Sequence, residues 1–214
     1  RCKNNVNLKV LTQEGLAVEY LGMNMKKTPL DDIRVRRAIA KGLDVDLINR
    51  VTSNGIYKTA TSPCAPDVEY SIANKLRVKK RDVEGAKNLL FEAGYGNGLQ
   101  LTFLVAQSFE RMEMAGKIKE QLWRIGIDLE MKIVEWDEFL ERIQEGEAEL
   151  FLMGSATDLP DPDGVLRDSF ISTSLYEDGN YFGCADEELD SLLQAGIRTT
   201  DPKKRKEIYE KAQL

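Results

Sequence analysis

Histidine is absent from the 214-residue sequence, and its three cysteines, Cys2, Cys64 and Cys184, are widely spaced with no C-x-x-C pair. An odd number of scattered cysteines argues against a disulfide framework, and a zinc site lacks its usual ligands. Without histidine, neither a Ser-His nor a Cys-His pair is available to activate a nucleophile. The sequence also has no G-x-S-x-G elbow and no phosphate-binding loop. These absences predict a protein that is not an enzyme and that holds no cofactor or metal.

Long apolar runs are missing as well, since no stretch approaches the roughly 20 apolar residues of a membrane-spanning helix. The 30 lysines and arginines are outnumbered by 36 acidic residues, which gives a formal net charge of −6. This balance argues against nucleic acid as a partner. Two local basic runs, 34–37 and 79–81, lie among acidic residues and are interpreted as solvated faces.

The two ends of the chain carry different signals. No charged n-region or apolar h-region follows Arg1, so we expect either a processed protein or a piece of a longer one. Near the other end, Asp201-Pro202 is a typical N-cap and first-turn pair. The helix that it starts shows no C-cap signal before Leu214. We expect a chain that is truncated at its C-terminus within this helix.

Aspartates begin the helices that are expected in the first half of the chain. Asp31, Asp44 and Asp82 each precede apolar residues at helical spacing, so each is predicted to be an N-cap. Residues 56–70 contain prolines and show no clear period, which predicts a long loop between the second and third of these helices.

From residue 99 onward the hydrophobic pattern alternates between strand and helix periods. Residues 99–105 and 127–133 alternate with a period of two, which is typical of half-buried strands, and 149–154 is a more continuously apolar strand. Helical spacing over 112–125 and 139–143 lies between them. This β-α-β-α-β order predicts an α/β fold with a mixed sheet, flanking helices and right-handed crossovers between parallel strands.

The last of these strands runs directly into a proline-rich acidic segment, residues 155–164. Ligands of open α/β sheets bind beyond the carboxyl ends of the strands, so this segment is the best site candidate in the sequence. Aspartate and proline are also ordinary turn residues, and a purely structural role is an equal alternative.

Three chemistries are open to carboxylates in this segment. If Asp161 and Asp163 were the third and fifth ligands of a calcium loop, the first and twelfth positions would be Leu159 and Phe170, which have no ligand side chain. Paired acids for hydrolysis would need supporting residues that the sequence does not offer. A carboxylate on a stiff segment binds an ammonium group without a partner base or metal, which matches the residues present.

A set of motifs occurs in order from about Leu16 to Leu214. They are Tyr20-Leu21-Gly22-Met23-Asn24, Thr28 to Ile39, Leu43-Asp44-Val45-Asp46, Ala86 to Tyr95, Ile125-Gly126-Ile127 followed by Glu135-Trp136, and Asp158 to Pro162. Their types and order resemble the cluster 5 solute-binding proteins, the group of dipeptide, oligopeptide and nickel receptors.

The resemblance implies one lobe of a periplasmic-binding-protein-like type II fold. Residues 1–25 would form a strand that enters from a hinge region, and 26–214 the C-terminal ligand-binding lobe. The implied function is the substrate-binding component of an ABC importer for peptides or similar small solutes, in the periplasm or at the cell surface. The membrane permease would be its partner, and only this permease or an absent lipid anchor would hold it at the membrane. A ligand-sensing domain of a regulator and, less favoured, an acid-dependent hydrolase are the alternatives.

The resemblance also implies roles for several residues. Asp158 would hold the α-amino group of a ligand, main-chain groups of Gly154, Ser155 and Ala156 would line the cleft, and Trp136 would lie near ligand side chains. Peptide-binding members often carry a tryptophan at the position of Ser155, so this departure puts a standard peptide ligand in question.

The candidate ligand-binding set is completed by Asp161, Asn24 and Tyr57. For Asn24 and Tyr57, a turn or packing role is the preferred interpretation. For Trp136, a core position is the alternative. Asp163 lies beyond the prolines and is expected to tolerate substitution by asparagine.

Overall fold

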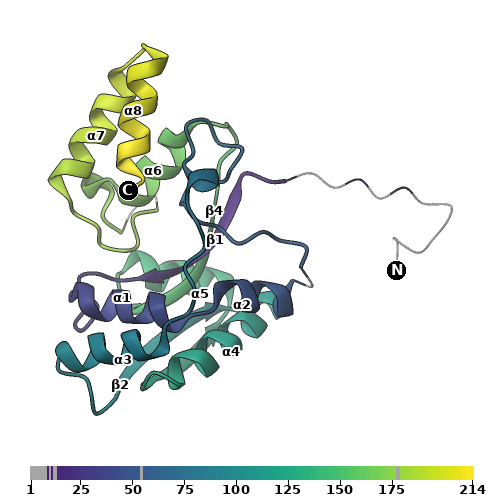
Figure 1. The fold of residues 1–214 in the computed structure, drawn as a ribbon, viewed down its shortest axis with the longest axis vertical. Coiled ribbons are helices and arrows are strands. Elements are labelled where there is room, and N and C mark those ends of the chain that lie inside the picture. Colours follow the sequence, from purple (N-terminus) through teal and green to yellow (C-terminus); the bar gives the residue numbers. More distant parts are fainter. Residues whose placement is uncertain (1–8, 10, 12–13, 54, 177–178) are drawn as a thin grey trace.

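The computed structural model describes residues 9, 11, 14–53, 55–176 and 179–214 (Figure 1). The described residues form a four-stranded sheet in the order β1-β4-β2-β3. The strands are β1 Ala17–Met23, β2 Leu99–Ala106, β3 Ile127–Val134 and β4 Leu150–Ala156. β2 is parallel to both β3 and β4, whereas β1 is antiparallel to β4. The predicted mixed α/β sheet is confirmed.

Helices connect and cover these strands. The α-helices of the described chain are α1 Ile33–Gly42, α2 Val45–Thr52, α3 Val83–Glu92, α4 Phe109–Trp123, α5 Trp136–Gln144, α6 Pro162–Phe170, α7 Glu187–Arg198 and α8 Pro202–Ala212. Two short 3-10 helices are η2 Ala73–Lys75 and η3 Ser172–Ser174. Asp44, Asp82 and Asp201 are the predicted N-caps, and each carboxylate accepts a main-chain amide of its first helical turn.

The cap of α1 lies one residue later than predicted. Asp32, not Asp31, accepts the amide of Arg34, at 2.7 Å. The carboxylate of Asp31 instead accepts the hydroxyl of Thr28, at 2.9 Å, because the chain is still in the turn that precedes the helix. Adjacent aspartates both fit the cap pattern, and only the turn geometry separates them.

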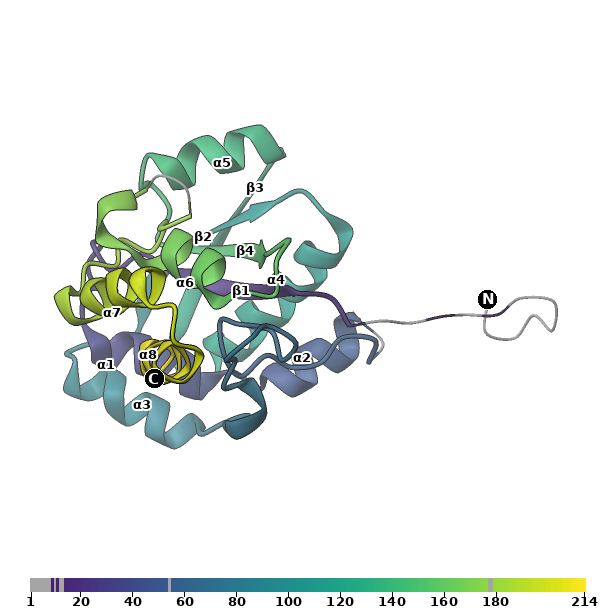
Figure 2. The same cartoon turned by 90° about the horizontal axis from the view of Figure 1, so that it is seen from above.

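The sheet is covered on both faces. Alternate β2 residues point to opposite sides, so that Leu101 and Phe103 lie in a core with α1, α3 and α4, whereas Leu104 lies in a second core with α5. Figure 2 shows α1 and α3 on one side of the sheet and α5 on the other. This placement brings the carboxyl ends of β2, β3 and β4 to one edge.

A third, smaller core lies beyond the carboxyl end of β4, where α6, α7 and α8 pack together and against the loop that contains Cys64 (Figure 1). The predicted loop over 56–70 is confirmed, since its described residues contain no helix or strand. The last predicted helix ends at Ala212 rather than running to Leu214. Gln213 caps it and donates from its side-chain amide to the carbonyls of Tyr70 and Tyr209, at 3.0 and 2.9 Å.

The N-terminal part of the chain contributes β1, which lies within the predicted entering segment, whereas residues 1–8 are outside the described residues. Cys64 and Cys184 are buried free thiols, and Cys2 is likewise outside the described residues. Within the described ranges, no helix has the length and apolar character that a membrane crossing requires.

Candidate functional site

The acidic segment after β4 is shorter than the sequence indicated. β4 continues to Ala156 and α6 begins at Pro162, so only residues 157–161 remain between them, and we call them the acidic turn. The Thr157 hydroxyl closes this turn by donating to the Leu159 carbonyl at 2.7 Å and accepting the Leu159 amide at 3.3 Å. The turn therefore follows the carboxyl end of a sheet strand, where ligands of α/β folds bind.

Asp158 lies at the exposed part of the acidic turn. Among the described residues, no hydrogen bond or ion pair involves its carboxylate. A carboxylate that the fold does not use is free to bind a cation from solution.

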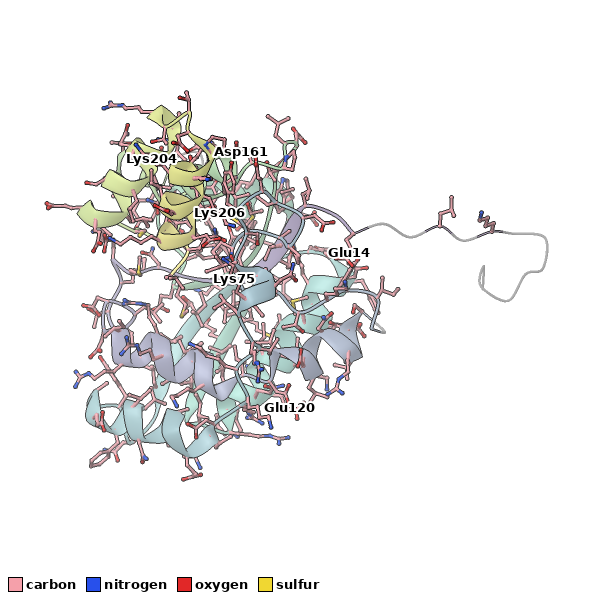
Figure 3. All side chains as sticks on the ribbon, turned by 45° about the horizontal axis from the view of Figure 1, so that its top comes forward. Glu14, Lys75, Glu120, Asp161, Lys204 and Lys206 are labelled. Atoms are coloured by element: carbon pink, nitrogen blue, oxygen red, sulfur yellow. The ribbon has the colours of Figure 1, made fainter. Side chains whose placement is uncertain are left out.

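Asp161 has a structural role instead. Its carboxylate accepts the Asp163 amide at 2.8 Å as the N-cap of α6, and it forms an ion pair with Arg205 of α8, with Arg205 Nη1 2.8 Å from Asp161 Oδ2. Figure 3 shows Asp161 beside α8. Both of its carboxylate oxygens are engaged by the protein, so the contacts of Asp161 favour a role in folding over the ligand contact that the sequence implied.

Asp163 is also held inside the protein, and its tolerance of substitution by asparagine stays a prediction. Its carboxylate accepts two hydrogen bonds from Arg167, at 2.9 and 2.8 Å, and one from the Tyr209 hydroxyl at 2.7 Å. Asp161 and Asp163 thus tie the start of α6 to α8, which leaves Asp158 as the available acid.

These contacts set the charge states of the ion-paired groups. Burial raises the pKa of the Asp161 carboxyl, but the hydrogen bonds from Arg205 and from the Asp163 amide outweigh burial and bring the pKa below its ordinary value. The hydrogen bonds to Asp161 raise the pKa of Arg205. Burial and the hydrogen bond to Asp163 raise the pKa of Tyr209. Asp161 and Arg205 are therefore oppositely charged at neutral pH.

Trp136 begins α5, directly after β3, and is 42% exposed. Its ring stacks on Phe139 with centroids 5.5 Å apart, and the guanidinium carbon of Arg111 lies 5.3 Å from its centroid. The alternative interpretation of Trp136 as a core aromatic is wrong, because one part of the ring packs on the protein and the rest faces solvent.

The end of β4 is formed by Gly154, Ser155 and Ala156, whose main-chain groups are predicted to line the ligand cleft. Gly154 pairs with Glu19 of β1, Ser155 with Val18, and Ala156 with Ala17. A Cβ atom at Gly154 would lie 2.6 Å from the Glu19 carboxylate. Glycine therefore leaves room for that side chain.

An ion pair between Arg111 and Glu19 links the ring of Trp136 to β1, at the residue that pairs with Gly154. Arg111 Nε donates to Glu19 Oε1 at 2.7 Å, and the Arg111 guanidinium lies over Trp136. Sequence reasoning missed Glu19 and Arg111, which are 92 residues apart. No local pattern marks either residue.

Asn24 and Tyr57 are not part of this arrangement. Asn24 is 1% exposed and donates to the carbonyls of Gly146 and Ala148, at 3.1 and 3.2 Å. It follows the end of β1, which pairs with the start of β4, and therefore lies at the opposite end of the sheet from the acidic turn. These contacts support the interpretation of Asn24 as a packing residue and not as a ligand contact.

Tyr57 lies in the loop after α2 and is 59% exposed. Its carbonyl accepts the Asn49 side-chain amide at 2.9 Å. Within the described part of the chain, no contact joins its side chain to Asp158 or Trp136. The structure therefore does not bring Tyr57 together with the other candidates.

Solved structures similar to this one include peptide-binding proteins of bacteria. The DppA protein of Helicobacter pylori in complex with peptide STSA has a TM-score of 0.86 at 29% identity, over 93% of this chain and 39% of that one. A dipeptide binding protein of Pseudoalteromonas in complex with Met-Leu has a TM-score of 0.87 at 27% identity, over 99% of this chain and 43% of that one. The α/β lobe thus has the fold of one part of these larger solute-binding proteins.

The family is shown by sequence. Residues 1–176 match the family described as bacterial extracellular solute-binding proteins, family 5 middle, and the chain belongs to this family. The dipeptide-binding protein of Escherichia coli is 29% identical over 100% of this chain and 41% of its own length. Heme-binding protein A of Haemophilus influenzae is 29% identical over 100% of this chain and 40% of its own length. The chain therefore spans about 40% of the curated relatives that it matches, and the resemblance inferred from the motifs is confirmed.

Proposed function

We propose that this chain is part of the substrate-binding receptor of an ABC importer, and that Asp158 binds the cationic amine of its solute. The observation that carries the proposal is the different use of three neighbouring aspartates. Asp161 and Asp163 are ion-paired within the fold, whereas the exposed Asp158 carboxylate has no such partner among the described residues. A charge-assisted hydrogen bond to an ammonium group needs a carboxylate of this kind.

The cellular setting is proposed from the same relatives. The Escherichia coli relative is a dipeptide-binding protein and the Helicobacter pylori relative a periplasmic binding protein, which supports a receptor outside the cytoplasmic membrane rather than an enzyme. A receptor of this kind passes its solute to the membrane permease of the importer. We propose that permease as the protein partner.

The chemistry of the ligand is proposed from Asp158 and not from the family. Relatives are named for dipeptides and for heme, so family membership alone does not select between them. Ser155 has a small side chain where the resemblance implies an aromatic ring, so it offers no ring to stack on a ligand side chain. The Asp158 carboxylate favours a solute that carries an amine, and a dipeptide is the simplest such probe.

Calorimetry on the full-length protein tests this assignment with the dipeptide Met-Leu and with N-acetyl-Met-Leu, which lacks the ammonium group. We expect wild type to prefer the free amine. We expect Asp158→Asn to weaken Met-Leu binding about 30-fold or more, because the bound solute would cover Asp158 and the covered charge pair loses one partner. Asp158→Asn should leave the weak binding of the acetylated peptide unchanged.

Glu207→Gln is the matched control. It removes one negative charge from an exposed carboxylate on α8 that forms no hydrogen bond with other described residues. Its Met-Leu affinity should equal that of wild type. Equal Met-Leu affinities of wild type and Asp158→Asn would contradict the role proposed for Asp158.

A further inference from the structure

The acidic turn is fastened to the rest of the protein at its second half. The Pro160 carbonyl accepts the amide of Glu69 at 2.8 Å, and the next residue, Asp161, is ion-paired to Arg205. Asp158 lies three residues before Asp161, and Pro160 stiffens the chain between them. The position of Asp158 thus depends on anchors that do not include Asp158 itself.

Arg205 is the central anchor. Its Nη1 and Nη2 atoms lie 2.8 and 2.9 Å from the two oxygens of Asp161, a two-pronged contact that fixes orientation as well as distance. Its guanidinium carbon lies 4.8 Å from the ring centroid of Tyr209 and 5.9 Å from that of Tyr70. Because Tyr70 directly follows Glu69, Arg205 supports both chain segments that meet at the Pro160 carbonyl.

We propose that Arg205 is a positioning residue of the solute site, which acts through Asp161 to hold Asp158 in its binding orientation. This inference rests on the proposed function, in which Asp158 binds the amine of the solute. Arg205 itself does not contact the solute. It keeps the acidic turn in one conformation, so that solute binding does not have to order the turn.

A neighbouring ion pair provides a matched control. Arg167 forms the same two-pronged contact with Asp163, at 2.9 and 2.8 Å, and its side chain is about as exposed as that of Arg205, 20% against 18%. Both members of this second pair lie within α6. Arg167 also donates to the Leu193 carbonyl of α7 at 2.8 Å, as Arg205 donates to the Gly196 carbonyl of α7 at 3.3 Å. Arg167→Gln therefore removes similar contacts but leaves the ion pair of Asp161 in place.

The first test needs no ligand. Hydrogen exchange of the full-length protein, read by mass spectrometry, would follow the amide of Glu69, whose acceptor is Pro160, in wild type, Arg205→Gln, Arg205→Lys and Arg167→Gln. In Arg205→Gln we expect exchange about 10-fold faster or more, since a charge-assisted contact is lost. Arg205→Lys, which keeps the charge but not the two-pronged geometry, should lie between wild type and Arg205→Gln. The inference would be overturned if the Glu69 amide exchanged in Arg205→Gln at the wild-type rate. It would also be overturned if Arg167→Gln accelerated this exchange as much as Arg205→Gln.

The second test measures whether the anchor acts through Asp158. In calorimetry with Met-Leu, Arg205→Gln should weaken binding about 10-fold in the wild-type background and have no further effect in Asp158→Asn. A full additional loss in the Asp158→Asn background would show that Arg205 acts by another route and would refute the proposal. If the wild-type protein does not bind Met-Leu, the proposed dipeptide ligand fails, and the exchange experiment alone decides whether Arg205 holds the turn.

Discussion

Two glycines inside helices should respond in opposite ways to the same substitution, because only one of them faces another helix. A Cβ atom at Gly116 in α4 would meet no atom within 4 Å. A Cβ atom at Gly196 in α7 would lie 2.6 Å from Cζ and 2.7 Å from the hydroxyl of Tyr209. The substitution to alanine therefore tests the α7–α8 packing that supports the acidic turn.

The expected magnitudes follow from the surroundings of each glycine. In an exposed helix, alanine in place of glycine stabilises by about 1 kcal/mol, which we expect for Gly116→Ala. At Gly196 the same gain is opposed by overpacking, which costs about 1–3 kcal/mol. Tyr209 is fully buried and donates to Asp163 at 2.7 Å, so moving its ring endangers a further contact worth about 1.5–3 kcal/mol. We expect a net destabilisation of about 2 kcal/mol for Gly196→Ala.

Thermal unfolding of the full-length protein followed by circular dichroism measures both effects. Gly116→Ala should raise the midpoint by about 1 °C, and Gly196→Ala should lower it by about 2 °C, because the shift per kcal/mol falls as the length of the protein rises. If Gly196→Ala proved as stable as Gly116→Ala, the close contact between α7 and Tyr209 would be refuted.

Three further predictions concern other parts of the molecule. The folded-state pKa of Asp161 is lowered, so its ion pair stabilises the fold above the unfolded-state pKa of about 3.9 and loses this effect as the pH falls through the folded-state value. The stability advantage of wild type over Asp161→Asn in denaturant titrations should therefore shrink in acid, and a constant difference would contradict the lowered pKa. In Cys2→Ser protein at about pH 8, a thiol reagent should label neither Cys64 nor Cys184 before unfolding. Both thiols are buried, and burial raises the pKa of Cys64 to about 12. Rapid labelling of the native protein would count against this packing. Asn24→Ala should lower the free energy of unfolding by about 2–3 kcal/mol, because it leaves main-chain carbonyls unpaired. Its Met-Leu affinity should be unchanged. Loss of binding at unchanged stability would show that Asn24 is a ligand contact.

Much of the secondary structure could be predicted because its signals are local. The alternation over 99–105 and 127–133 sets which side chains face each core, and the aspartate caps at Asp44 and Asp82 satisfy amides only a few residues away. Asp161-Pro162 carries the same kind of signal, because this pair starts α6 as Asp201-Pro202 starts α8. The neighbouring acids and prolines nevertheless favour a loop there on pattern alone.

The candidate site was predictable only in part. The order of motifs located the acidic turn and Trp136, and the strand pattern placed both after the ends of sheet strands. The supporting pairs Glu19–Arg111 and Asp161–Arg205 join residues 92 and 44 positions apart. No local pattern links such residues.

The sequence by itself therefore determined the α/β class, the position of the turn, and the three aspartates in it and at the start of the next helix. Only the tertiary structure decided how these acids differ, because the folding of α8 onto α6 places Arg205 against Asp161 and Tyr209 against Asp163. Asp158 is exposed, and no basic side chain of the described helices forms an ion pair with it. The role of a carboxylate depends on the charges and donors that folding brings within a few ångströms, and residue type and spacing along the chain do not contain that distance.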